Sequence, residues 1–166
     1  MRRSLSMLAA GTGLCAALAT ASVTHAAPLA PTVASQLVTV SGGPTECGPG
    51  SASKIIDQRQ NGDGTTSPFV IPAKTVFVIT AFEYLFTGAS ASQNIYATLA
   101  VTDAGLTTSS IVSSPTAPSD STGRGGGTLQ LPSGFAVKPG AKLCFTISTG
   151  NNGIAGFVHG FFAKDK

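Results

Sequence analysis

Few side chains in this chain could do acid–base or nucleophilic chemistry, since its 166 residues include two histidines and seven carboxylates. His159 lies in the apolar segment GFVHGFF, on the strand face that it shares with Phe157 and Phe161. A serine relay needs such a histidine between a hydroxyl and a carboxylate. The chain lacks the Gly-x-Ser-x-Gly turn that presents the serine of α/β-hydrolases. We therefore expect His159 to be a hydrogen-bonded structural residue.

Glu83 is the carboxylate best placed for catalysis, because it interrupts the apolar run Ala81–Tyr84. Glycoside hydrolysis needs two carboxyl groups that face one cleft. A carboxylate among aromatic residues is either buried with a raised pKa or marks the solvent side of a strand, and we favour the solvent side. We expect a protein that is not an enzyme and assign no catalytic residue. A hydrolase that uses His159 or Glu83 is the alternative.

Metal binding is equally disfavoured. A zinc site built from His and Cys needs three or four such ligands, and His159 stands alone once the cysteines pair. The segment RQNGDG at 59–64 has the glycines of a calcium loop. Arg59 and Val70 stand where the EF-hand pattern needs acidic residues, which leaves only a weak calcium site at Asp57 and Asp63 as an alternative. We predict no metal and no cofactor.

Ligand binding without chemistry is the better prospect. Exposed aromatic rings can pack against sugar rings, but the chain has no Trp and only two tyrosines, Tyr84 and Tyr96. This disfavours sugar binding by ring stacking and leaves binding by hydrogen-bonding loops open. Arg124, in the predicted loop 119–127, could bind a carboxylate or phosphate. Asn151 and Asn152, in the predicted loop 149–153, add hydrogen-bonding amides. These five residues are the predicted binding residues.

The first 26 residues have the layout of a secretory signal peptide. Arg2 and Arg3 precede the apolar run 8–21, and Thr24-His25-Ala26 supplies small residues before a cleavage point. The apolar run is too short for a membrane-spanning helix. We expect a secreted or periplasmic bacterial protein with a Pro/Ala-rich leader at 27–35 and one domain at 36–166. Export by the Sec or the twin-arginine route stays open.

The cysteines fit that compartment. Cys15 leaves with the signal peptide, so Cys47 and Cys144 remain. An even number of cysteines in an oxidising compartment predicts a disulfide. Closing a loop of roughly 100 residues stabilises a fold by at most about 4–5 kcal/mol in the chain-entropy model.

The charge balance argues against two kinds of partner. Of the ten Lys and Arg residues, two lie in the signal peptide, which leaves eight against seven acidic residues. A near-neutral surface gives no electrostatic reason to bind nucleic acid or anionic lipid. We predict no nucleic-acid partner and no membrane span after signal cleavage.

Short apolar or alternating segments separated by Gly, Pro, Asn and Ser predict an all-β fold. We expect an antiparallel β-sandwich of about eight strands, with jelly-roll or Greek-key topology. The expected strands are 37–40, 54–57, 75–87, 95–101, 107–114, 128–131, 142–149 and 154–163. The run Gly42-Gly43-Pro44 is expected to end the first strand.

The segment 75–87 is apolar on both faces, which a sandwich strand with one wet face should not be. Either a bulge exchanges its faces midway, or a loop or a neighbouring subunit covers the outer face. We favour the loop, and a homo-oligomer, such as a trimer, is the main alternative.

Together these features predict a secreted, non-catalytic β-sandwich. Its role would be structural, adhesive or ligand-recognising at or outside the cell envelope, with a glycan or another cell-surface component as partner. A small eight-stranded outer-membrane barrel is the second alternative, because such a chain length would suffice for one.

Overall fold

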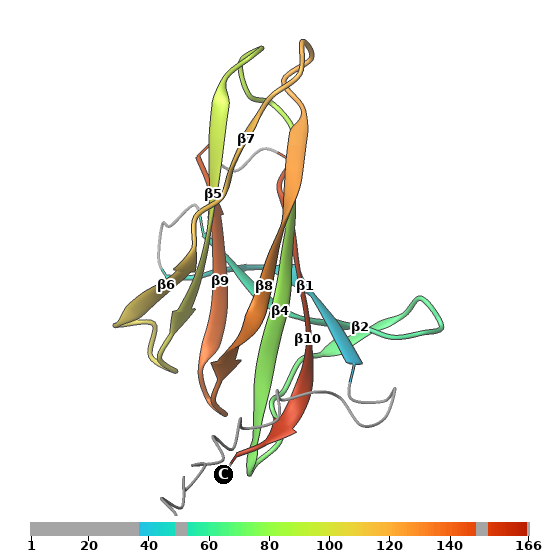
Figure 1. The fold of residues 1–166 in the computed structure, drawn as a ribbon, viewed down its shortest axis with the longest axis vertical. Coiled ribbons are helices and arrows are strands. Elements are labelled where there is room, and N and C mark those ends of the chain that lie inside the picture. The colour runs from blue at the N-terminus through green and yellow to red at the C-terminus, as the bar shows by residue number, and fades with distance from the viewer. Residues whose placement is uncertain (1–36, 49–52, 149–152, 166) are drawn as a thin grey trace, which may run out of the picture.

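The computed structural model describes residues 37–48, 53–148 and 153–165 and shows an all-β protein (Figure 1). No helix occurs in these ranges. The predicted signal peptide and leader, Asn151 and Asn152 lie outside the described residues. The strands are β1 (Leu37–Glu46), β2 (Lys54–Gln60), β3 (Thr66–Pro68), β4 (Thr75–Phe86), β5 (Asn94–Thr102), β6 (Ser109–Ser113), β7 (Thr116–Pro118), β8 (Gly125–Val137), β9 (Lys142–Ile147) and β10 (Ala155–Lys164).

Eight of these strands form nested antiparallel pairs, in which each pair lies between the two strands of the preceding pair along the sequence. β1 pairs with β10, β2 with β9, β4 with β8, and β5 with β6. The resulting order across the sheet is β6-β5-β9-β2-β1-β10-β4-β8, with β3 added beside β2 and β7 beside β5. The predicted fold class is confirmed as an antiparallel, eight-stranded jelly roll of Greek-key type.

The sheet folds over at β1 and β2, where register shifts beside Gly42 interrupt their pairing. We call β8-β4-β10-β1 the first sheet and β2-β9-β5-β6 the second sheet. The Phe145 ring of the second sheet reaches across the core to Gly42 and Gly156 of the first, where an added Cβ would lie 2.4 and 2.9 Å from it. On the opposite side β7 approaches β8, and the sheet is nearly closed into a barrel.

One hydrophobic cluster fills the space between the sheets. Strands of both sheets supply its largest fully buried side chains, which are Tyr84, Phe77, Phe82, Phe86, Phe145, Ile56, Ile79, Ile95, Leu99, Leu143, Ile147 and Val40. Burying each such side chain contributes roughly 1.5–3 kcal/mol to folding before the entropic cost is counted. This shared core holds the two sheets together.

A β-bulge explains most of the doubly apolar pattern of β4. Pairing with β10 runs through Ile79 and then Ala81, so Thr80 is an extra residue. Phe77 and Ile79 point into the core before the bulge, and Phe82 does so after it. A single inserted residue exchanges the two faces of a strand. The bulge was one of three explanations that the sequence left open for the doubly apolar pattern. Because of it, odd-numbered residues of β4 point into the core before Thr80 and even-numbered residues do so after it.

A second, smaller cluster remains on the outer face of the first sheet. It contains Val76, Val78 and Phe161, each no more than 6% exposed. A Cβ added to Gly134 would lie 2.5 Å from Val78 Cγ1, so this part of β8 packs against the cluster. Cover of this face by a loop or by a neighbouring subunit stays a prediction.

The predicted disulfide joins Cys47, just after β1, to Cys144 in β9. The two Cα atoms lie 6.0 Å apart. Cys144 points away from the core, because its neighbours Leu143 and Phe145 point into it. The bridge therefore fastens the connection between β1 and β2 to the outer face of the second sheet.

Several predicted strand boundaries were wrong, and two of them fall at glycines. β1 continues through Gly42 and Gly43, where we expected it to end, and β8 begins at Gly125 rather than in a loop. At Gly125 an added Cβ would lie 2.5 Å from Phe86 Cζ. These glycines serve close packing inside strands, whereas the sequence pattern suggested turns.

Candidate functional site

Tyr84 is not available to a surface ligand, although it was a predicted binding residue. It is 1% exposed. Its ring stacks with Phe82 and Phe86 at centroid distances of 5.7 and 6.5 Å. Burial raises the pKa of its phenol. The bulge at Thr80 turns Tyr84 inward, and a simple alternation of residues from the start of β4 would not reveal this.

Tyr96 is the exposed tyrosine, with 53% of its surface accessible. It lies on the outer face of β5, because its neighbours Ile95 and Ala97 are fully buried. Its backbone amide donates a hydrogen bond to Ser148 Oγ at 3.1 Å, and its carbonyl accepts one from the Ser148 amide. The backbone of Tyr96 is therefore held in place while its ring faces solvent.

A pocket of about 310 Å³ opens on the same outer face, beside Thr98 and further along β5 from Tyr96. Ten residues line it, and none carries an ionisable side chain: Cys47, Ser53, Thr98, Ala100, Thr102, Leu106, Ser109, Ile111, Cys144 and Thr146. Both cysteines are in the disulfide. We call this surface, with Tyr96, the hydroxyl face.

The hydroxyls of this face are partly engaged with one another. Thr98 Oγ1 lies 3.1 Å from Ser114 Oγ, and Ser53 Oγ hydrogen-bonds to Thr146 Oγ1. Each hydroxyl has one donor and two acceptor positions, so capacity for a ligand remains after one such bond. The side chain of Ile111, 69% exposed, adds an apolar wall. The face can hydrogen-bond to a neutral, hydroxylated ligand and also pack against its carbon atoms.

Arg124 lies at the end of a tightly bonded turn between β7 and β8. The carboxylate of Asp120 accepts hydrogen bonds from the Arg124 amide at 2.9 Å and from the amide and hydroxyl of Thr122 at 2.7 and 2.8 Å. The Arg124 amide first, then the Thr122 hydroxyl and amide, lower the pKa of Asp120. The carboxylate thus holds the turn from inside.

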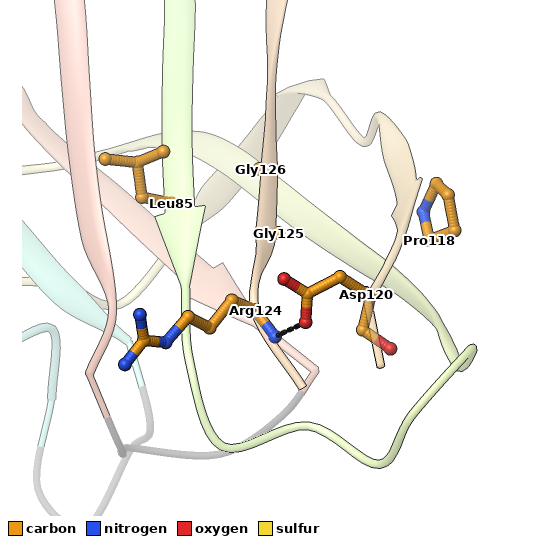
Figure 2. A pocket seen from close by; sticks show the side chains of 7 residues that line it. Leu85, Pro118, Asp120, Arg124, Gly125 and Gly126 are labelled. Carbon is orange, nitrogen blue, oxygen red and sulfur yellow. Dashed lines mark hydrogen bonds between the residues drawn. The ribbon is translucent and has the colours of Figure 1, made fainter. Parts of the chain in front are cut away.

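The side chain of Arg124 leaves this turn and borders a second pocket, of about 590 Å³ (Figure 2). Leu85 of β4 and Pro118 of β7 line it from either side, Gly125 and Gly126 form its floor, and Ser119 and Asp120 complete the lining. In Figure 2 the guanidinium group points away from Asp120 and lies on the same side as Leu85. We call this pocket the Arg124 pocket.

His159 and Glu83 meet on the outer face of the first sheet. His159 Nε2 lies 3.6 Å from Glu83 Oε2, and Nδ1 lies 3.1 Å from Thr39 Oγ1. The side chains of His159 and Glu83 are 37% and 41% exposed. A pocket of about 300 Å³ opens beside Thr39 and His159. Glu83 thus faces solvent, as the sequence suggested.

Sequence reasoning missed the pocket residues Thr98, Thr146 and Leu85. The alternation of β5 in the sequence predicts that Thr98 faces outward, because its neighbour Ala97 points into the core. The pairing of β5 with β9, which brings Thr98 beside Thr146, joins segments far apart in the chain and leaves no local signal. From the sequence, Leu85 resembles the core residues around it. In the structure the bulge at Thr80 turns its side chain outward, where it is 48% exposed.

Three further comparisons concern metal ligands, membrane-spanning helices and similarity to known proteins. Within the ranges that the structure describes, no three His, Cys, Asp or Glu side chains gather as a metal site would require. No helix in those ranges is long and apolar enough to cross a membrane. No protein-family model and no curated protein matches the chain.

Proposed function

We propose that this protein is a secreted, non-catalytic recognition protein that binds a glycan of the cell envelope or its surroundings on the hydroxyl face. The observation that carries the proposal is the pocket lined by ten uncharged residues next to the exposed Tyr96. Jelly rolls include lectin domains, which makes the fold compatible with this role but does not assign it.

The chemistry of a sugar matches this surface in two respects. A neutral sugar offers hydroxyls that both donate and accept, and Thr98 and Thr146 can complement either kind. Its carbon–hydrogen faces are apolar and pack against aromatic and aliphatic side chains, here Tyr96 and Ile111. An uncharged lining also avoids the cost of burying an unpaired charge beneath a neutral ligand.

Binding of the mature protein to neutral cello-, xylo- and manno-oligosaccharides, measured by calorimetry, tests the proposal. We expect Tyr96→Ala to weaken binding at least about tenfold, which corresponds to roughly 1.4 kcal/mol. Val70→Ala is the matched control, because Val70 is 71% exposed but lies outside the hydroxyl face. Equal affinities of wild type and Tyr96→Ala would refute the proposed site, and no glycan binding at all would refute the function.

A second candidate function, hydrolysis, is favoured by the row Thr39–His159–Glu83. A hydroxyl, an imidazole and a carboxylate in contact are the elements of nucleophilic catalysis. Thr39 and His159, however, pair directly across β1 and β10, whose mutual pairing runs without a register shift. Ester or glycoside hydrolysis that His159→Ala and Glu83→Gln both abolish would establish this function in place of the first.

Self-association also stays a proposal. Leu37 and Leu85, 57% and 48% exposed, lie toward opposite ends of the first sheet's outer face. A homo-oligomer, such as a trimer, could cover one of them. Multi-angle light scattering of the mature protein decides between monomer and oligomer.

A further inference from the structure

Arg124 is the positively charged residue of its pocket, which Asp120 also lines. The hydrogen bond from the Arg124 amide is the largest of the causes that lower the pKa of Asp120, and the Arg124 charge is the smallest. No described residue forms an ion pair or side-chain hydrogen bond with the Arg124 guanidinium. The nearby carboxylate of Asp120 is already the acceptor for Thr122 and for the Arg124 backbone. Arg124 therefore presents its planar set of donors to the pocket, in the geometry that binds a carboxylate with two parallel hydrogen bonds.

The backbone that carries Arg124 is held from several directions. The Asp120 amide donates to the Arg124 carbonyl at 2.7 Å, and the Gly123 amide donates to the Asp120 carbonyl at 3.1 Å. The Ala89 amide donates to the Gly123 carbonyl, which ties the turn to the β4–β5 connection. Gly123 has a φ of 77°, and an added Cβ would lie 2.1 Å from the Ala89 carbonyl oxygen. A ligand at Arg124 would thus meet a preformed site.

The rest of the pocket suits the body of a sugar ring. Leu85 and Pro118 supply apolar contacts on two sides of the opening. Gly126 has no side chain above the floor, since an added Cβ would lie 2.8 Å from Leu85 Cδ2. A sugar acid combines a carboxylate with an apolar ring face, and both parts find partners here.

The Arg124 pocket is also continuous with the hydroxyl face. β7 pairs with β5 through Tyr96 opposite Thr116 and Asn94 opposite Pro118. β7 then lies against β8, where an added Cβ on Gly125 would be 2.8 Å from the Pro118 carbonyl oxygen. Figure 1 shows β7 between β5 and the start of β8. Two strand spacings, roughly 10 Å, separate β5 from β8, a span that an oligosaccharide can bridge.

We infer that the glycan is acidic and that Arg124 binds the carboxylate of a sugar-acid unit while Tyr96 contacts a neighbouring unit. This inference rests on the proposed function, because it names the class of glycan that the same surface would take. Charge-assisted hydrogen bonds of this kind change affinity by about 10- to 100-fold.

Oligogalacturonic acid and its fully methyl-esterified form test the inference, because esterification removes the charge and keeps the sugar rings. We expect the mature protein to bind the acid form at least about tenfold more tightly than the ester at low salt. Arg124→Gln should abolish this preference by lowering the affinity for the acid form to that for the ester. Lys138→Gln is the matched control, because it removes one positive charge from the exposed turn between β8 and β9, at the far end of β8.

The outcomes separate the two proposals. Equal affinity for acid and ester, both lost in Tyr96→Ala, would refute the role of Arg124 and keep glycan recognition. A preference for the acid that survives in Arg124→Gln would also refute it. NMR titration with glucuronate and glucose is a second readout: shifts of the Arg124 Nε and Gly126 amide signals with glucuronate alone support the site, and their absence refutes it whether or not the polymer binds.

Discussion

The two outer faces of the jelly roll differ in chemistry although the inner faces share one core. The first sheet carries the contact between Glu83 and His159 and a small cluster of covered apolar residues. The second sheet carries an uncharged pocket, the disulfide and Tyr96. The inner faces are constrained by packing, whereas the outer faces are free to differ. We therefore expect the functional site on an outer face, where side chains do more than face solvent. The outer face of the second sheet, with its uncharged pocket and Tyr96, fits this expectation better than that of the first sheet.

The disulfide should show the largest effect on this comparison, because it fastens the connection between β1 and β2 to the outer face of the second sheet. Replacing Cys47 and Cys144 by serine should lower the free energy of unfolding by about 4–5 kcal/mol, since the bridge closes a loop of 97 residues. Binding on the hydroxyl face should weaken as well, because both cysteines line its pocket. Urea unfolding of the variant and the oxidised protein measures the first effect. A change below about 1 kcal/mol would contradict the entropic account.

A close contact within the first sheet should show the next largest effect. A Cβ added to Gly160 would lie 2.2 Å from the Val78 carbonyl oxygen and 2.8 Å from the Phe77 ring. Gly160→Ala should therefore destabilise the fold by about 1–3 kcal/mol, because β10 must move away from β4. Gly62→Ala is the control, since nothing lies within 4 Å of its added Cβ. Thermal unfolding that ranks the two variants equally would count against the tight approach of these strands.

The ion pair of the first sheet should contribute little. Glu83→Gln should change the free energy of unfolding by less than about 1 kcal/mol, because both partners are more than a third exposed and solvent screens them. Glu46→Gln, which breaks the pair of Glu46 with Lys54 at 3.8 Å, gives a matched comparison. Glycan binding should be the same in both variants. A loss confined to Glu83→Gln would move the functional site to the surface around Glu83 and His159.

The smallest effect concerns pH and the Arg124 turn. Hydrogen bonds from the Arg124 amide and from Thr122 hold the pKa of Asp120 below its ordinary value of 3.8. Because this pKa is depressed on folding, the stabilisation is complete above about pH 4 and is lost as the pH falls through the folded pKa. The NMR shift of the Arg124 amide should follow this titration. Asp120→Asn should remove the pH dependence of this NMR shift. If the shift of the Arg124 amide changes with pH in the same way in that variant, the titration does not belong to Asp120.

A comparison of β5 with β4 shows why part of the site could not be predicted. Ile95, Ala97 and Leu99 alternate regularly, so Tyr96 could be placed outside from sequence. Tyr84 could not be placed, because one extra residue at Thr80 reverses the faces of β4. Bulges arise from pairing with distant strands, and their local sequence is ordinary.

Composition and periodicity were sufficient for the all-β class, the approximate number of strands and the pairing of Cys47 with Cys144. Each of these depends on residue type, local alternation or the count of available partners. The nested strand order, the uncharged pocket and the path from Tyr96 to Arg124 depended on the tertiary structure. They are made by residues that lie dozens of positions apart and meet only when hydrogen bonding across the sheet brings their strands together.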